Sequence, residues 1–245
     1  MRCMQLDIPR FCRRAFVAFA LPCALARADV VADWNAIAIE TVTALERDTA
    51  QAAYAIATVH VAMFEVMNFI EGGYVPRFLV KPPAPFARSG EAAAAAAAHY
   101  VLREMHPGRS AALDAALERS LAPVREEAEK SAARTWGRHL GANIYAIRSS
   151  DKGEAPPSLL PSLEALEASA SPATAPDSVA KLAAMNAAVA AFIESRRLKP
   201  IEAARVHAAA SMAVSDALLT QHNSQFSTAQ RRQPWSSCAW ANMGE

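Results

Sequence analysis

The longest stretch of helical spacing in this chain lies between Ala55 and Phe78. Hydrophobic residues recur there as they do on the buried face of a helix, at Ile56, Val59, Val61, Met63, Val66, Met67 and Ile70. Gly72 and Gly73 follow, and glycine at this point favours the left-handed residue with which many helices end. The pattern predicts one long core helix that stops at the double glycine and that the rest of the chain packs around.

Helical patterns also occupy most of the remaining chain. They cover approximately residues 33–46, 89–105, 110–120, 123–147, 177–197 and 200–224. The alternating pattern of hydrophobic and polar residues that is typical of strands is lacking. The expected N-terminal caps, for these helices and for the core helix, are Asp33, Thr49, Ser89 and Asp177, while Pro123 and Pro200 fit first turns. Only 8 of the 245 residues are glycine, and alanine, the best helix former, is abundant. The sequence therefore predicts an all-α helical bundle.

Two of these helices carry specific packing expectations. The helix that follows Ser89 contains seven consecutive alanines, so its surface is smooth and lets a neighbouring helix approach closely. The helix that follows Pro123 is expected to bury the hydrophobic positions Ala128, Ala132, Trp136, Leu140, Ile144 and Ile147.

Shifts in composition divide the chain into five segments. Residues 149–177 are rich in serine, proline and alanine without a sustained period, which is typical of a linker. The linker separates an N-terminal helical bundle, 29–148, from a central helical pair, 178–223. Residues 224–245 lose the helical period and are expected to form an irregular tail.

Residues 1–28 have the pattern of an export signal. Arginines precede a short hydrophobic run, 15–25, and Ala26-Arg27-Ala28 forms an A-x-A cleavage site before Asp29. The run is too short for a permanent membrane anchor. Arg13-Arg14 also fits a twin-arginine signal, so either an ordinary secretory route or a twin-arginine route is open. The mature chain is therefore expected in the periplasm or outside the cell.

Charge and cysteine content narrow the function further. The formal net charge is +1, and the whole chain carries no basic excess of the kind that binds nucleic acid. Of the four cysteines, only Cys238 lies outside the export signal, so no internal disulfide is expected after cleavage. The six histidines lack HExxH or HxxxH spacing, and no metal site is expected.

One string in the core helix resembles a signature of the vanadium-dependent haloperoxidases, which are relatives of the type-2 phosphatidic acid phosphatases. The matching residues are Val59-His60-x-Ala62-Met63-Phe64-Glu65-x-x-Asn68-x-Ile70-Glu71-Gly72, then Tyr74 and Pro76. The segment Ala32-Asp33-Trp34-Asn35 with Ala38 is similar to the opening of the family's mature chains. The resemblance covers the family's N-terminal and central helices, and it implies an incomplete version of their helical core.

The resemblance also implies which residues would do chemistry. The family binds vanadate or phosphate through Lys-x6-Arg-Pro, Pro-Ser-Gly-His and Ser-Arg-x3-Gly-x-His blocks, whose cationic groups neutralise the oxyanion. Aligned from Asp216, the first block gives Ser224 at the lysine position, Arg231 at the arginine position and Arg232 at the proline position, and the other two blocks are absent. Arg231 and Arg232 are the oxyanion-binding candidates that remain, and no catalytic residue and no cofactor are expected for this chain, although the family uses vanadate.

Two carboxylates recur in a weak internal repeat, Ala62-x-x-Glu65 and Ala213-x-x-Asp216. Both lie on largely apolar helices, where a carboxylate needs a hydrogen-bonding or ionic partner. We expect Glu65 and Asp216 to be structural.

Three hypotheses of function follow. In the first hypothesis, the chain is a non-catalytic, truncated or naturally short relative of the haloperoxidases. It then forms a homo-oligomer or associates with a helical partner chain. Alternatively, a partner subunit completes a vanadate- or phosphate-dependent site around Arg231 and Arg232. A third hypothesis is a helical module that binds an apolar ligand or partner through the methionine-rich faces around Met63 and Met67.

Overall fold

The computed structural model describes residues 29–46, 48–76, 78, 87–150 and 178–225, with side chains described as far as residue 218. Within these residues the chain forms seven α-helices and one 3-10 helix and contains no strand, which confirms the all-α class. The elements are α1 (Val30–Leu45), α2 (Thr49–Glu71), α3 (Gly90–Met105), η1 (Pro107–Arg109), α4 (Ser110–Leu121), α5 (Glu127–Ser150), α7 (Val179–Arg196) and α8 (Pro200–Gln225).

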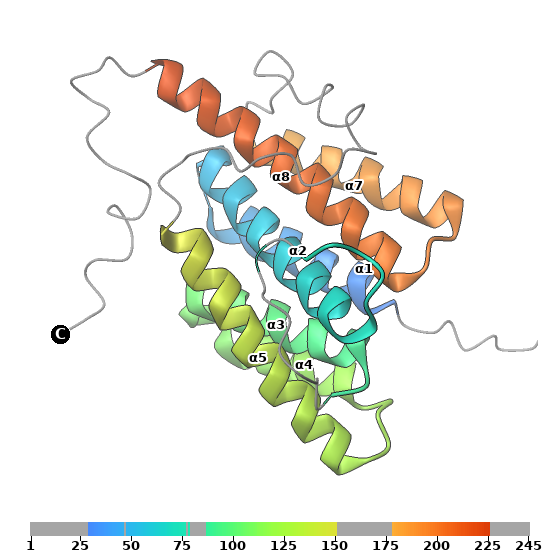
Figure 1. The fold of residues 1–245 in the computed structure, drawn as a ribbon. Helices are drawn as coiled ribbons and strands as arrows, with labels where there is room; N and C mark the ends of the chain where they lie inside the picture. The colour runs from blue at the N-terminus through green and yellow to red at the C-terminus, as the bar shows by residue number, and fades with distance from the viewer. Residues whose placement is uncertain (1–28, 47, 77, 79–86, 151–177, 226–245) are drawn as a thin grey trace, which may run out of the picture.

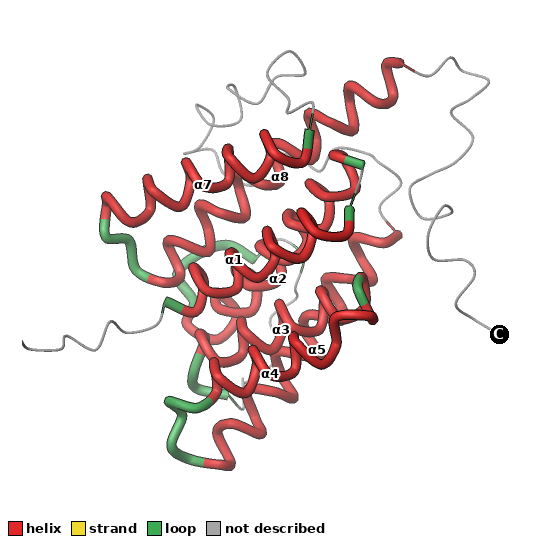
Figure 2. The backbone as a smooth tube through the Cα atoms, turned by 180° about the vertical axis from the view of Figure 1, so that it is seen from behind, coloured by secondary structure: helices red, strands yellow, loops and turns green. Residues whose placement is uncertain are grey.

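Helix α2 lies in the middle of the bundle, as its apolar pattern predicts. It packs against α8 on one side and against α3 on the other, and α5 packs against α3 and also contacts α2 (Figure 1). Seen from behind, α7 and α8 form one outer layer, α1 and α2 the middle, and α3, α4 and α5 the other outer layer (Figure 2). Among the described helices, α2 alone is long and apolar enough to cross a membrane, and 89% of its most apolar window is buried inside the bundle. Here it serves as the core helix.

The ends of α2 follow from local chemistry. The chain leaves the helix through Gly72 at φ 76° and Gly73 at φ 107°, which confirms that the double glycine supplies positive φ angles. The start differs from prediction, because Asp48 rather than Thr49 is the cap. Its carboxylate accepts hydrogen bonds from the backbone N–H groups of Ala50 at 2.8 Å and Gln51 at 3.1 Å.

Two other predicted caps are wrong by a few residues. Helix α1 is capped by Asp29, which has an extended backbone and accepts from the N–H of Val31, whereas Asp33 lies inside the first turn. Helix α7 is capped by Ser178, and Asp177 lies outside the described residues. The Ser89 cap of α3 is confirmed.

The predicted start of α5 is also wrong. Pro123 lies in the turn after α4, and α5 begins only at Glu127. Two segment boundaries move as well, because α5 continues through Ser150 into the predicted linker and α8 continues to Gln225 into the predicted tail. The export signal 1–28, the rest of the linker and residues 226–245 of the tail lie outside the described residues.

Helices α3 and α5 meet along a seam of small residues. A Cβ atom placed on Gly137 would lie 2.6 Å from the Cβ of Ala96 and would collide with the backbone carbonyl oxygen of Ala93. A Cβ on Gly141 would lie 3.0 Å from the Cα of Ala97. The close approach expected of the alanine-rich helix is confirmed, and it depends on glycine in the partner helix.

This seam corrects the predicted buried face of α5. The buried positions are Ala133, Gly137, Leu140, Gly141, Ile144 and Arg148. Ala128 is exposed and Ile147 is 38% exposed, so both were wrongly assigned to the core. The predicted positions Leu140 and Ile144 are confirmed as buried, and Ala132 and Trp136 are partly buried against the core. The periodicity of large hydrophobic residues misses the rest of this face because glycines, which carry no hydrophobic side chain, mark its centre.

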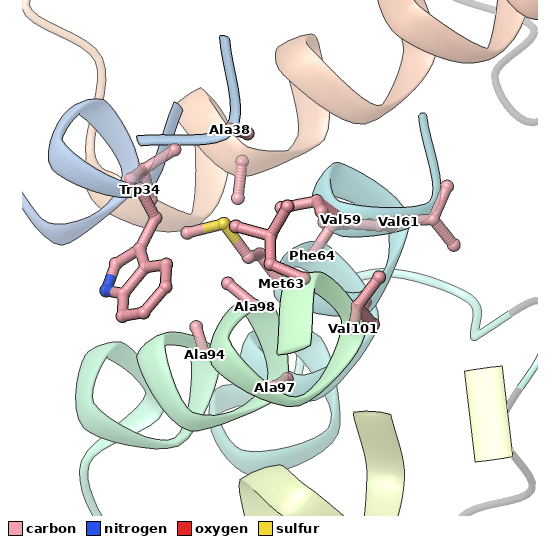
Figure 3. Close-up of a cluster of buried hydrophobic side chains, with 14 of the residues drawn as sticks. Trp34, Ala38, Val59, Val61, Met63, Phe64, Ala94, Ala97, Ala98 and Val101 are labelled. Atoms are coloured by element: carbon pink, nitrogen blue, oxygen red, sulfur yellow. The ribbon is translucent and has the colours of Figure 1, made fainter. Parts of the chain in front are cut away.

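The core between α1, α2 and α3 is tightly filled. The side chain of Met63 extends towards the indole of Trp34, above the methyl groups of Ala94 and Ala98 (Figure 3). Met63 and Met67 are both 0% exposed. They therefore cannot form the surface that the third hypothesis assigned to them.

Candidate functional site

The predicted oxyanion-binding residues, Arg231 and Arg232, lie outside the described residues, so that site stays a prediction. The two predicted structural carboxylates are described. Glu65 on α2 is 1% exposed, and its Oε2 accepts a hydrogen bond from the backbone N–H of Phe78 at 3.4 Å. Asp216 lies on α8, partly buried, and its role also stays a prediction.

The structure offers a different candidate, a partly open cavity between α2, α7 and α8. Its volume is about 380 Å³. The walls are formed by Ala53, Ile56, Leu182, Met185, Asn186, Ala188, Val189, Phe192, Val206, His207, Ala210, Ser211 and Val214. His207 is the one titratable residue among them, and the other residues are uncharged. With His207 in its neutral form, the walls carry no charge and favour an uncharged occupant.

A buried polar network lies behind one wall of this cavity. The His60 ring stands between Asn35 of α1, whose Oδ1 is 3.0 Å from His60 Nε2, and Ser211 of α8, whose Oγ is 3.2 Å from His60 Nδ1. The ring of His207 lies beside that of His60, with the ring centroids 4.6 Å apart. The network therefore ties α1, α2 and α8 together at the cavity.

Both imidazoles are held neutral. Burial lowers the pKa of His60 well below its usual value, and the neighbouring His207 lowers it further. Burial lowers the pKa of His207 to about 4. The rings are 1% and 2% exposed, so a proton on either would be taken from water into an apolar interior.

Ser211, His60 and Asn35 stand in the order of a nucleophile, a base and an orienting group, but the hydrogen bonds argue against that chemistry. The Ser211 hydroxyl donates to the backbone carbonyl of His207 at 2.6 Å, a shorter contact than the one to His60. A hydroxyl has one proton, and the carbonyl oxygen of His207 lies closer to the Ser211 hydroxyl than His60 Nδ1 does, so it competes with the ring for that proton. The arrangement is suited to holding helices together and to presenting polar groups at a cavity wall.

In the sequence, His60 and His207 are two of six histidines without metal-site spacing, and nothing in the pattern pairs them. The structure brings these two residues, 147 positions apart in the chain, into ring contact. The available signal was a set of polar residues on the inward faces of apolar helices, namely Asn35, His60, Asn186, His207 and Ser211. Periodicity shows that such residues point inward but not which of them meet.

No group of three or more histidine, cysteine, aspartate or glutamate side chains is placed to hold a metal ion in the part of the chain that the structure describes. No known protein family, no curated protein and no solved structure matches this chain.

Proposed function

We propose that this protein binds a small apolar molecule in the cavity between α2, α7 and α8. The observation that carries the proposal is the cavity itself, with apolar walls, a few polar groups and no charge. Small-molecule sites in proteins generally have this character and volumes of about 300–1,000 Å³. The proposal keeps the ligand-binding hypothesis but moves it from the two buried methionines to a site formed by α7 and α8.

Helix α7 provides the accessible wall of the site. It buries only Leu182, Asn186 and Ile193, and Phe192, which lines the cavity, is 46% exposed. A wall held by so few contacts opens more readily than the packed interface between α2 and α3. A ligand therefore has a route past α7 that does not disturb the core.

Two neighbouring alanines of α7 give a matched test. Ala188 lines the cavity, Ala187 lines a separate groove between α7 and α1, and both are exposed. The neutral probe N-phenylnaphthylamine is expected to bind saturably, with a rise in fluorescence. Ala188→Phe places a ring in the cavity and should weaken binding by about tenfold or more, whereas Ala187→Phe should change it by less than about twofold.

Circular dichroism checks that both variants remain folded. Unchanged binding in Ala188→Phe, or the same loss in both variants, would show that the probe does not occupy this cavity.

We further propose that the protein is exported and is related to the vanadium-dependent haloperoxidases without being catalytic alone. The support is the export-signal pattern of residues 1–28 and the core-helix string from Val59 to Pro76. An oxyanion site needs several converging cations, because a single exposed arginine binds phosphate weakly against water and salt. The sequence offers only Arg231 and Arg232 at the family's positions.

The isolated chain is therefore expected to show no bromide or chloride oxidation with vanadate and peroxide, and no phosphomonoesterase activity above background. Halide oxidation that disappears in Arg231→Ala would overturn this expectation and favour a partner-completed site. Turnover that this substitution leaves intact would place the chemistry elsewhere.

A further inference from the structure

Asn186 is the one buried residue of α7 whose side chain the packing of the helix does not explain. It is 9% exposed, it lines the cavity, and its amide has no hydrogen bond to any part of the chain that the structure describes. The other two buried residues of α7 are leucine and isoleucine. The amide carries two donors and an acceptor at the wall of a partly open cavity, and a ligand that covers it without pairing with these groups would lose affinity.

Resting on the proposed binding function, we propose that the ligand is a neutral amphiphile. It has an apolar body and one uncharged hydrogen-bonding group, a hydroxyl, that pairs with the Asn186 amide. A hydroxyl both donates and accepts, so it fits the amide in either orientation of its oxygen and nitrogen. In this arrangement Asn186 determines specificity, and the apolar walls supply most of the affinity.

The walls also exclude a charged head group. No lysine, arginine, aspartate or glutamate is among the residues that line the cavity, and the His207 ring is held neutral by burial. A carboxylate that entered would lose its water without meeting a counter-charge. Fatty acids and other anions are therefore disfavoured relative to alcohols of the same shape.

The volume limits the size of the ligand. A dry cavity of about 150 Å³ is known to take benzene, and this one measures about 380 Å³. An occupant with roughly two fused rings, or an aliphatic body of similar bulk, matches the space. Naphthol meets both the size and the polarity requirement, and methylnaphthalene and naphthoate are its apolar and charged analogues.

The Asn186 side chain also borders the groove between α1 and α7, which Asn35, Ile39 and Ala187 help to line. A ligand in that groove would meet the same amide. The two phenylalanine variants of α7 separate these locations, because Ala188→Phe obstructs the cavity and Ala187→Phe obstructs the groove.

The experiment measures the binding of naphthol, methylnaphthalene and naphthoate to the full chain by calorimetry, in the parent and in Asn186→Leu. Each protein is described by the ratio of its affinity for naphthol to its affinity for methylnaphthalene. Comparing this ratio between the parent and the variant cancels the difference between the two ligands in their transfer from water. This ratio should fall about threefold to tenfold in Asn186→Leu, the effect of one hydrogen bond. It should not change in Asn143→Leu, where an exposed asparagine of α5 receives the same substitution. Asn186→Ala provides a second variant if the leucine disturbs folding.

In the parent, naphthoate should bind at least about tenfold more weakly than naphthol. An unchanged ratio in Asn186→Leu and Asn186→Ala with both neutral ligands still bound would overturn the inference and leave the proposed function standing. Naphthoate binding as tight as naphthol would also overturn it, as would naphthol binding that is lost in Ala187→Phe and kept in Ala188→Phe. Failure of all three ligands and of the fluorescent probe to bind would instead overturn the proposed function.

Discussion

Gly137→Ala is expected to destabilise the bundle by about 2 kcal/mol, although alanine is the better helix former. In an exposed helix this substitution would stabilise by roughly 1 kcal/mol. At Gly137 the new Cβ would meet the carbonyl oxygen of Ala93 and lie 2.6 Å from the Cβ of Ala96. Backbone and Cβ atoms cannot rotate away, so α3 and α5 would have to separate, and overpacking of this kind typically costs about 1–3 kcal/mol or more. The steric cost therefore exceeds the helical gain.

Urea unfolding followed by circular dichroism measures this loss of stability. Alanine substitutions at two other glycines provide a graded comparison. The Cβ of Gly141→Ala would lie 3.0 Å from the Cα of Ala97, so a smaller loss is expected. Gly108 in η1 has no atom within 4 Å of an added Cβ, and Gly108→Ala should be close to neutral. A Gly137→Ala protein that is more stable than the parent would show that the helices are not in the contact described here.

The seam also shows what the sequence could and could not predict about the fold. Hydrophobic spacing placed α2 and its glycine stop correctly, because a long run of large apolar residues leaves little ambiguity. It placed Leu140 and Ile144 of α5 correctly but missed the rest of the buried face, where the closest contacts are made by glycines rather than by large side chains. Predicted caps missed by a few residues for a related reason. Asp29 and Asp33 are chemically equivalent as caps, and only the backbone conformation distinguishes them.

The candidate site was less predictable than the fold. Sequence alone drew attention to Arg231 and Arg232 through a family resemblance, and these residues are not described by the structure. The cavity is formed by α2 and by the consecutive helices α7 and α8, which lie far from α2 in the sequence. Its main polar residues, Asn186, His207 and Ser211, follow no known motif. A lone asparagine or histidine on an apolar helix gives no sign of its neighbours until the packing of α2, α7 and α8 is known.

The paired histidines should make the protein sensitive to acid. The pKa of His207 is about 4 in the folded protein and 6.5 in the unfolded chain, so the unfolded state binds the proton more readily. Stability is therefore fully present above pH 6.5 and is lost as the pH falls from there towards 4. The shift corresponds to roughly 3 kcal/mol for His207 alone. The pKa of His60 is shifted in the same direction, which adds to the loss.

Other titratable groups also change the stability of the fold as the pH falls, some against the paired histidines and some with them. Burial raises the pKa values of Glu46 and Glu71, so these carboxyls favour the folded state as the pH falls and partly offset the histidines. The pKa of His106 is lowered by burial and by Arg109, which adds to the acid loss. The acids with lowered pKa values, such as Glu129, keep their full contribution until the pH falls to the ordinary carboxyl pKa of 4.5, and they lose it below that value.

The measurement is the free energy of unfolding in urea at a series of pH values between 7 and 4. A single extra proton taken up on unfolding gives a slope of about 1.4 kcal/mol per pH unit. His207→Gln removes one such proton and should flatten the slope by up to about this amount, even if it also lowers stability at neutral pH. His139→Gln alters an exposed histidine of α5 and should leave the slope as in the parent. If both His207→Gln and His60→Gln keep the parental slope, the two rings are not held neutral by the fold, and the uncharged character of the cavity wall would have to be abandoned.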